Sequence, residues 1–520
     1  MKSLPAETDF VVIGAGIAGL RATIELSTAG RVLVLAKDEL PELNSPMQPG
    51  HTAPLSDEDE ITVHLQDTLT AGDGLCNPAA VKALVEEAPE RIEEVIAWSA
   101  QLDRDNRLIY SPEVAHSRSR VLHAQGEATV NEILRTLLAQ VHSLKNVFCA
   151  GSTFVTDLII EGGRVTGVSL VDETGVPAEI ACGAALLASG GMGQIYRHTT
   201  NPDPATADGA ALAFRAGAEV SDMEFIQFHS TALYLKKAPR FPLGEDLRSE
   251  GGHLRTIELN RFMGKYHPMG ELAPRDVMTR AIMHEMEVSR AKDPFVYLDL
   301  THLDPAKIRK RLPRIYATCM RLNIDITEDL IPVRPAAHYA LGGVRTDLEG
   351  QTNVPGLFAA GEVAATGAHG ANRLASNALL ESLVYGARAG RAMCRELKPI
   401  SKPHPQPKTA YSNGPVDVGV EQLIGQIQDL MWTNVGPARM RPGMQSTVHS
   451  LEEMAPKLAH PKTRRAHEAS HIHTAALLVA RSALAREESR GAHYRMDYPD
   501  HDDRRFLKHS ISRSDKIAFV

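Results

Sequence analysis

The hydrophobic pattern is clearest near the start of the chain. Apolar runs at 9–13 and 31–36 predict buried strands, and the stretch 20–29 between them has helical composition. A glycine-rich turn separates the first strand from the helix, and Gly30 can end that helix. This strand, turn, helix and strand unit predicts a fold of the α/β class, with a parallel sheet.

The same alternation continues to about residue 217 and returns near residue 356. Glu161-Gly162-Gly163 lies between two of the strands and predicts a hairpin. The predicted strands are 148–160, 164–171, 184–188 and 356–362, and the predicted helices are 67–71, 78–100, 130–141, 205–217 and 375–396.

The middle of the chain changes character. It is rich in arginine, histidine and proline, and it has two helical stretches, 274–288 and 304–321. Because the strand pattern returns afterwards, we expect an inserted domain at 231–340. The domain that surrounds it would be discontinuous, formed by 1–230 and 341–397.

The last quarter of the chain predicts a separate unit. Five prolines between 398 and 416 leave no helical pattern, which is typical of a linker. Residues 417–490 have helical patterns, so we expect 417–520 to form a C-terminal helical domain with a tail.

Composition narrows the class of protein. With 43% hydrophobic and 23% charged residues, the 520-residue chain is typical of a folded globular protein. The net charge of −8 gives no basic surplus for nucleic acid. The five cysteines contain no C-x-x-C pair, and no metal site is expected. No apolar run reaches the ~18 residues of a membrane span, and no signal-like segment begins the chain, so we expect a cytoplasmic protein that contacts no membrane.

Two glycine motifs indicate a nucleotide cofactor. Gly14, Gly16 and Gly19 form G-x-G-x-x-G between a strand and a helix, as a dinucleotide fingerprint requires. The usual ribose-binding acid is absent from the end of the second strand, where Lys37 stands instead. A second strand ends in Gly-Glu at Glu362. A plain glycine turn is the alternative, but the two signals together favour FAD.

Several short motifs then occur in a family-specific order. The chain resembles the succinate dehydrogenase and fumarate reductase flavoprotein family, and within it the L-aspartate oxidases. The resemblance extends from about residue 8 to Pro499. The motifs are Asn201-Pro202-Asp203, Asp208-Gly209, Gln227-Phe228-His229, Ala273-Pro274-Arg275-Asp276, Pro335-Ala336-Ala337-His338-Tyr339, His369-Gly370-Ala371-Asn372-Arg373 and Glu487-Glu488-Ser489-Arg490-Gly491-Ala492-His493.

The resemblance implies a Rossmann-like FAD-binding domain with an inserted capping domain, and an active site between them. Asn44 stands about where dehydrogenase subunits carry a histidine bonded to FAD, so non-covalent FAD is expected. The chain departs from the family in its flavin loop, Gln48-Pro49-Gly50-His51, and at Ser230 and Gly244. The implied cofactor residues are Gly14, Gly16, Gly19, Lys37, Gly50, Asp208, Glu362, Ala378 and Leu379.

Four residues of these motifs suit a dicarboxylate substrate. The arginines Arg275 and Arg373 offer planar forks for carboxylates, and His229 and His338 add donors. The resemblance implies that Arg275 exchanges the substrate proton.

Two glutamates complete the implied site. By the same resemblance, Glu245 contacts the substrate and relays the proton, and Glu113 meets the substrate ammonium. An acid at Glu113 would select an amino acid over succinate.

The function expected from the resemblance is FAD-dependent oxidation of L-aspartate to iminoaspartate. O2 or fumarate would accept the electrons, in the first step of NAD biosynthesis, and quinolinate synthase is suggested as a partner. Two alternatives remain open: a fumarate reductase or succinate dehydrogenase flavoprotein subunit, and a non-catalytic FAD-binding protein.

Overall fold

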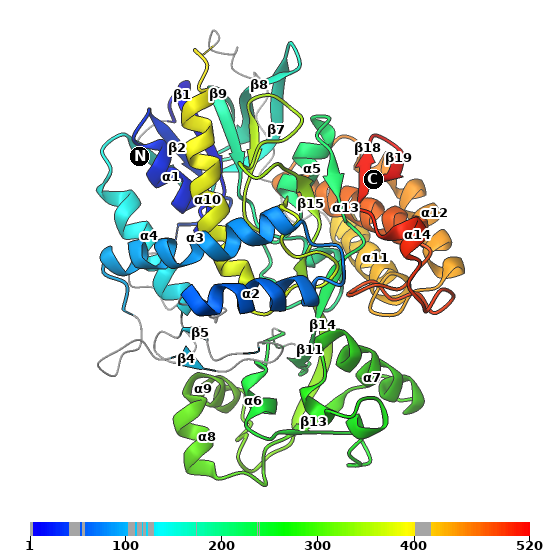
Figure 1. The fold of residues 1–520 in the computed structure, drawn as a ribbon. Helices are drawn as coiled ribbons and strands as arrows, with labels where there is room; N and C mark the ends of the chain where they lie inside the picture. The colour runs from blue at the N-terminus through cyan, green and yellow to red at the C-terminus, as the bar shows by residue number, and fades with distance from the viewer. Residues whose placement is uncertain are drawn as a thin grey trace.

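A largely parallel sheet forms the centre of the molecule (Figure 1), so the α/β class predicted from the sequence is confirmed. The computed structural model describes residues 4–40, 53–54, 58–101, 110–111, 117, 121–122, 129–172, 174–236, 238, 240–400 and 418–520. The strand order is β6-β2-β1-β9-β8-β7, with β16 also paired to β9. Their bounds are β1 Glu7–Ile13, β2 Val32–Leu35, β6 Val147–Ala150, β7 Phe154–Glu161, β8 Arg164–Val171, β9 Pro177–Leu187 and β16 Leu357–Ala359.

The strand predicted at 148–160 is wrong as a single element. β6 ends at Ala150, and Ser152 has a φ of 51°, so the chain turns before β7 begins. β6 then pairs in parallel with β2, whereas β7 pairs antiparallel with β8. A short turn with positive φ therefore directs two adjacent strands to different neighbours in the sheet.

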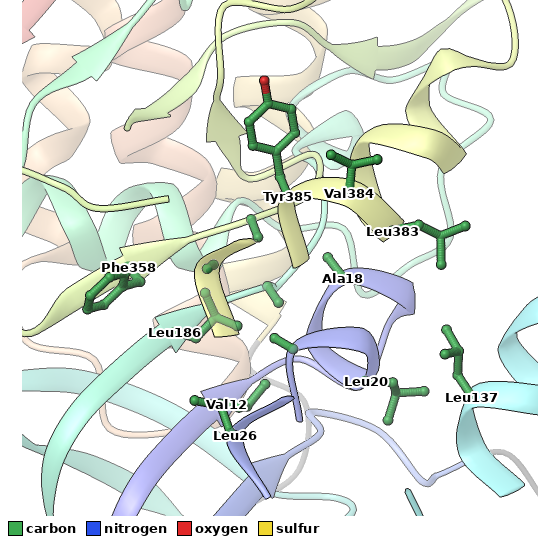
Figure 2. Packing of buried hydrophobic residues seen from close by; sticks show 14 of the residues in the cluster. Val12, Ala18, Leu20, Leu26, Leu137, Leu186, Phe358, Leu383, Val384 and Tyr385 are labelled. Carbon is green, nitrogen blue, oxygen red and sulfur yellow. The ribbon is translucent and has the colours of Figure 1, made fainter. Parts of the chain in front are cut away.

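Helices cover one face of this sheet, and a large apolar core lies beneath them (Figure 2). Gly386 and Gly390 of α10 lie against α1, where an added Cβ would stand 2.7 Å and 2.8 Å from the carbonyl oxygens of Ala18 and Ala22. The absence of side chains at these glycines lets the two helices pack closely. The helices here are α1 Ile17–Leu26, α3 Pro78–Ala97, α4 Thr129–Ser143 and α10 Asn377–Glu396.

The inserted segment builds a separate antiparallel sheet, in the order β11-β14-β13-β12, seen at the bottom of Figure 1. The helix predicted at 304–321 is wrong as one element, because Leu312 leaves the helical conformation before Pro313 starts a second helix. The elements are β11 Ile226–Leu233, β12 His253–Arg255, β13 Val296–Asp299, β14 Ile331–Ala340, α6 Asp246–Ser249, α7 Arg275–Val288, α8 Pro305–Arg311 and α9 Pro313–Arg321.

The strands β11 and β14 belong to two cores. Leu233 and Val333 pack in the core of the inserted segment. Phe228 and Ala337, at the other end of the same strand pair, pack with the C-terminal helices. The pair therefore connects the inserted segment to the rest of the molecule.

The tail contains strands as well as the predicted helices. β18 pairs with β10, so the last residues complete a sheet of order β17-β15-β10-β18-β19. Isolated strands of four residues carry little pattern, and the sequence analysis missed them. The elements are α11 Val418–Asn434, α12 Arg441–Leu458, α13 Arg464–Ala485, α14 Asp503–Phe506, β10 Val220–Ser221, β15 Gly343–Arg345, β17 Ala364–Ala365, β18 Ser510–Arg513 and β19 Lys516–Phe519.

The remaining elements include a small sheet of order β3-β5-β4. They are α2 Glu58–Ala71, α5 Asp208–Arg215, β3 Ala53–Pro54, β4 Tyr110–Ser111 and β5 Val121–Leu122, with short 3₁₀ turns at Gly193–Ile195, Met263–Lys265 and Gly270–Leu272. Within the described residues, no helix is long and apolar enough to cross a membrane. The domain boundaries given above stay predictions, and most of the predicted linker at 398–416 lies outside the described residues.

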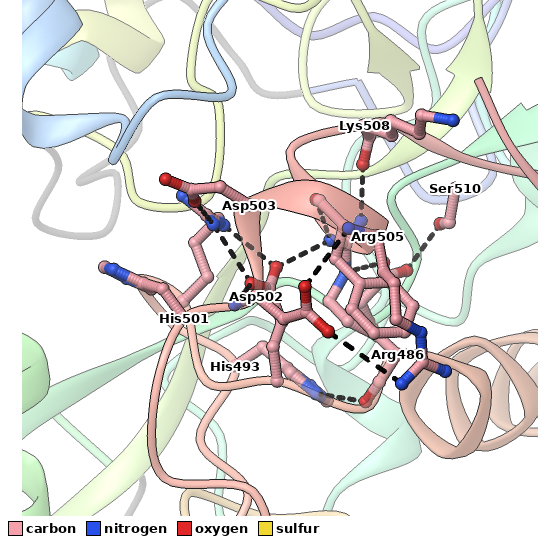
Figure 3. Close-up of polar contacts among 12 residues, drawn as sticks. Arg486, His493, His501, Asp502, Asp503, Arg505, Lys508 and Ser510 are labelled. Carbon is pink, nitrogen blue, oxygen red and sulfur yellow. Dashed lines mark hydrogen bonds and ion pairs between the residues drawn. The ribbon is translucent and has the colours of Figure 1, made fainter.

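Arg486 is a buried cation that holds the tail in place (Figure 3). Its Nε donates to Glu224 at 2.7 Å and its Nη1 to Glu488 at 2.9 Å, and both carboxylates are fully buried. The guanidinium also donates to the carbonyl oxygens of Phe506 and Lys508 at 2.7 Å and 2.8 Å. One side chain thus joins the end of α13 to the segment that precedes β18.

We predict that Arg486→Met destabilises the fold by about 3–5 kcal/mol, because two carboxylates would remain buried without their cation. Arg505→Met is the control, since Arg505 pairs with Glu487 on the surface, and it should cost about 1 kcal/mol or less. Thermal unfolding of the two variants measures the difference. Equal losses would contradict the assigned role of Arg486.

Candidate functional site

The carboxyl ends of β1, β2, β9 and β16 meet at one edge of the parallel sheet, because these strands run in the same direction. Gly14 and Gly16 follow β1, Lys37 follows β2, and Glu362 follows β16. This edge is where open α/β sheets bind nucleotides. The structure thus brings together predicted cofactor residues that are far apart in the sequence.

The three glycines of the first turn have different surroundings. Gly14 has a φ of +117°, and a Cβ there would lie 2.1 Å from the carbonyl oxygen of Ala188. A Cβ on Gly19 would lie 2.0 Å from the carbonyl oxygen of Gly14. Gly16, the N-cap residue of α1, has no heavy atom within 4 Å of the Cβ position. Two glycines are therefore required by packing, and the third leaves open space at a helix N-terminus, which suits an anion.

Lys37 and Asp208, which the sequence predicts as two separate cofactor contacts, form an ion pair with one another. Lys37 Nζ lies 2.9 Å from Asp208 Oδ2 and 3.1 Å from Glu468 Oε1. His471 Nδ1 lies 2.8 Å from Asp208 Oδ1. Burial opposes ionisation of Asp208, but the hydrogen bond from His471 and the charge of Lys37 outweigh it and hold the pKa of Asp208 well below its ordinary value. Helix α13 of the tail thus takes part in this end of the site.

Glu362 is a half-buried acid with few compensating groups. Its Oε1 accepts a hydrogen bond from the backbone N–H of Ala340 at 3.0 Å. Burial raises the pKa of Glu362 to about 7, although the Ala340 amide and the charge of Arg373 oppose the shift. Glu362 can therefore be neutral near physiological pH and act as a hydrogen-bond donor.

Two of the residues predicted for the substrate, Arg275 and Arg373, are joined through a third side chain. Gln227 on β11 joins the two arginines: Arg275 Nη1 donates to its Oε1 at 3.3 Å, and its Nε2 donates to the carbonyl oxygen of Arg373 at 2.9 Å. Its Nε2 also donates to Asn372 Oδ1 at 2.9 Å. The motif containing Gln227 was recognised in the sequence, but this bridging role was not.

Glu245 lies between two arginines of the inserted segment. Arg275 Nε donates to Glu245 Oε1 at 2.6 Å, and Arg248 Nη2 lies 3.2 Å from the same oxygen. Burial would raise the pKa of Glu245, but the charges of Arg275 and Arg248 outweigh burial and keep the pKa below its ordinary value. Burial also lowers the pKa of Arg248. The sequence analysis missed Arg248, whose position one helical turn after Glu245 was the available signal.

The two histidines face one another across the strand pair. The rings of His229 and His338 lie 5.1 Å apart between centroids, with an interplanar angle of 74°, and both residues are buried. His338 Nδ1 lies 2.7 Å from Thr200 Oγ1, and Asn201 Nδ2 donates to the His338 carbonyl oxygen at 2.7 Å. Neighbouring polar groups thus orient His338.

Arg373 lies over an aromatic ring that contacts a buried carboxylate. Its Cζ is 4.5 Å from the centroid of Tyr339, whose hydroxyl donates to Glu381 Oε2 at 2.8 Å. Glu381 also binds His369 at 2.9 Å and Thr366 at 2.6 Å. The hydrogen bond to an anion makes the tyrosine ring a better partner for the guanidinium. Arg373 is therefore held in position although it carries a charge in a buried place.

Comparisons with known proteins agree with this geometry. Residues 9–379 match a family described as FAD binding domain, and residues 425–518 match the fumarate reductase flavoprotein C-terminal family. L-aspartate oxidase 1 of Ralstonia nicotianae is 39% identical, over 94% of this chain and 95% of the relative. The L-aspartate oxidase of Pseudomonas aeruginosa is 38% identical, over 95% and 96%. The chain belongs to the L-aspartate oxidase branch of the succinate dehydrogenase and fumarate reductase flavoprotein family.

Solved structures of the family share the fold. A variant of the E. coli quinol fumarate reductase subunit FrdA superposes with a TM-score of 0.88 at 28% identity, covering 100% of this chain and 97% of that one. Mycobacterium smegmatis Sdh1 gives 0.84 at 30% identity, covering 99% and 94%. FAD is the cofactor of this flavoprotein. The open space at Gly16, beside a helix N-terminus, fits its pyrophosphate.

Some residues that the sequence predicts for the flavoprotein site lie outside the part of the chain that the structure describes. Glu113 and Gly50 lie outside the described residues, as do Asn44 and the loop 48–51. Ala378 and Leu379 are buried in the first turn of α10, which begins at Asn377.

The glycine pair Gly14 and Gly16 separates folding from cofactor binding. Gly14→Ala should destabilise the apoprotein by about 1–3 kcal/mol, because the new Cβ would meet backbone atoms. Gly16→Ala should leave the apoprotein stability almost unchanged, but weaken FAD binding about tenfold, or about 1.4 kcal/mol. Thermal unfolding and FAD titration of both apoproteins provide the measurements. Full FAD affinity in Gly16→Ala would exclude close approach of the pyrophosphate there.

The raised pKa of Glu362 predicts a pH-dependent stability. Its pKa of about 7 in the fold exceeds the ordinary 4.5, so its contribution to stability is present at low pH and is lost as the pH rises through 7. Glu362→Gln should remove that loss. Melting temperatures of wild-type and variant apoprotein, compared at about pH 5 and about pH 8, should diverge at the higher pH. If the melting temperatures of wild type and variant changed with pH in the same way, the raised pKa of Glu362 would be contradicted. Glu453→Gln, which changes a surface carboxylate, is the control.

Proposed function

We propose that the protein oxidises L-aspartate to iminoaspartate and passes the electrons to O2 or fumarate, as the first step of NAD biosynthesis. The observation that carries the proposal is the arginine pair of half-buried Arg275 and buried Arg373, which Gln227 joins. The full-length relatives named L-aspartate oxidase support the choice of substrate.

The binding step follows from the charges at the site. A dicarboxylate requires a cation at each end, and guanidinium forks bind carboxylates in two places. Arg275 and Arg373 supply these forks, while His229 and His338 supply further donors. Because the arginines are largely removed from water, their attraction for a dianion is stronger than at a surface.

The proton step uses the groups of the inserted segment. Bound FAD supplies the acceptor for the hydride that leaves the substrate. Glu245 takes the proton that Arg275 Nε donates to it, and the neutral guanidine left at Arg275 takes the proton that leaves the substrate. Glu245 is ionised and can receive the proton, and Arg248 on its other side continues the relay. Exclusion of water by the inserted segment would strengthen each of these contacts.

Glu113 is proposed to meet the substrate ammonium. Its position outside the described residues leaves this role to the family resemblance and to its chemistry. An acid attracts the ammonium of L-aspartate and repels a plain dicarboxylate, so it discriminates in the required direction.

The proposal also covers the compartment of the enzyme, its partner and its link to FAD. The five cysteines are free, which suits a reducing compartment such as the cytoplasm. Iminoaspartate is an unstable product, and quinolinate synthase is the proposed partner that would take it. FAD is proposed to bind without a covalent link, since Asn44 cannot form a histidyl bond.

Anaerobic mixing tests the function directly. The purified yellow protein should be bleached by L-aspartate and should keep its colour with succinate. Bleaching by succinate alone would favour the succinate dehydrogenase alternative, and no bleaching by either would favour a non-catalytic flavoprotein. Acid precipitation of the same sample should leave the flavin in the supernatant; colour in the pellet would overturn non-covalent binding.

Glu113→Gln is the matched test of specificity. It should weaken L-aspartate binding by about 1–3 kcal/mol, the range of a charge-assisted hydrogen bond, and this loss appears as a higher KM. The inhibition constant of succinate should stay nearly unchanged. An equal loss for both ligands would mean that Glu113 is structural.

We further predict that Arg275→Lys and Arg373→Lys each lower turnover about a hundredfold, or about 3 kcal/mol. Lysine keeps the charge but loses the planar fork. FAD content should remain normal, which distinguishes this loss from misfolding. Turnover near the wild-type rate in either variant would remove that arginine from the site.

A further inference from the structure

Two histidines and an aspartate lie close together in the inserted segment, at the start of β12, the end of β13 and the turn that follows β13. His253 opens β12 and is the register partner of Asp299, the last residue of β13. His302 follows in the next turn, in the spacing Asp-x-x-His. One donor atom from each of the three residues lies within 4.8 Å of the other two.

We propose that His253, Asp299 and His302 form a binding site for a divalent transition-metal ion of the zinc type. Imidazole and carboxylate are ligands that zinc accepts, and three protein ligands leave one position for water. The site is independent of the aspartate-oxidising centre, since none of its three residues contacts the groups assigned to catalysis in the described structure.

The two imidazole rings are stacked, 4.1 Å apart between centroids with an interplanar angle of only 9°. Because imidazole lone pairs lie in the ring plane, the exposed His302 ring would turn out of this stack to bind the same ion as His253. His253 Nδ1 is buried and has no hydrogen-bond partner among the described residues. A buried nitrogen without a partner is costly, and a metal ion would satisfy it.

Hydrogen bonds from neighbouring groups orient the other two proposed ligands, His302 and Asp299. Ligands in known metal sites are oriented in the same way. His302 Nε2 lies 3.1 Å from the carbonyl oxygen of Gly251, to which it can donate, leaving a lone pair on Nδ1. Asp299 Oδ1 accepts from the backbone N–H and the hydroxyl of Thr301 at 2.9 Å and 2.8 Å, and its Oδ2 accepts from Arg255 at 2.6 Å. Each carboxylate oxygen has two lone pairs, so these bonds leave room for a metal.

The nearby charges do not prevent binding. Arg255 is paired with Asp299, and Arg261 is paired with Glu271 at 3.1 Å.

A bound ion would stabilise the turn that carries the proton relay. Gly251 N donates to the Arg248 carbonyl oxygen at 3.0 Å, and Gly252 N donates to that of Leu247 at 2.9 Å. His253 comes directly after these two glycines. The metal would therefore tie the end of α6 to β13, and we expect a higher melting temperature of the protein when zinc is present.

Calorimetric titration of Zn2+ into the tag-free, chelator-treated flavoprotein tests the proposal. One ion per chain should bind, and His302→Ala and His253→Gln should each weaken binding by at least about tenfold, since even outer partners of metal ligands contribute that much. His284→Ala, which removes an exposed histidine of α7, is the control and should bind zinc as the wild type does.

The outcomes are decisive in both directions. No zinc binding by the wild type, or equal binding by the wild type and His302→Ala, would overturn the site. Loss in His302→Ala with full binding in His253→Gln would overturn the assigned ligand set. His302 is exposed, so its variant should fold, and unchanged flavin content and turnover with L-aspartate in zinc-free buffer would verify that.

Discussion

Arginine side chains packed away from water are the feature on which the site depends. Glu245 contacts Arg275 and Arg248 at once, so one carboxylate serves two cations. Arg373 lies over the ring of Tyr339, whose hydroxyl donates to Glu381. A dianionic substrate would add negative charge beside these cations, which explains how a buried cationic cluster can serve binding rather than merely destabilise the fold.

The tail shows the opposite balance. Arg486 has two buried carboxylates and two carbonyl oxygens as acceptors, and it needs no ligand. Arg490 likewise pairs with Glu488. The same residue type thus performs a structural role where one guanidinium meets two carboxylates, and suits anion binding where two guanidiniums share one carboxylate. Counting arginines in a motif could not distinguish the two cases, because the number of paired carboxylates is a property of the fold.

The sequence predicted what depends on local pattern. The α/β class and the glycine turn follow from periodicity and from residues whose conformational needs are strict, as Gly14 with its positive φ illustrates. The break after Leu312 could have been predicted from Pro313. The separation of β6 from β7, the strands of the tail and the role of Arg248 depend on partners far away in the chain. The metal ligands were missed for the same reason: His253 and Asp299 meet only because β12 and β13 pair.

The predicted site residues come from two places: the strand pair β11 and β14, and the helices α6 and α7 of the inserted segment. Gln227, His229, His338 and Tyr339 all lie on these strands, whose ends pack with the C-terminal helices. Glu245, Arg248 and Arg275 lie instead on or beside α6 and α7 of the inserted segment. Glu245 thus binds Arg275 and Arg248 beside the two helices, while the two histidines lie on the strand pair that connects the inserted segment to the rest of the molecule. Arg275 Nη1 donates to Gln227, and Gln227 Nε2 donates to the Arg373 carbonyl oxygen, so an amide side chain of this strand pair links the two arginines.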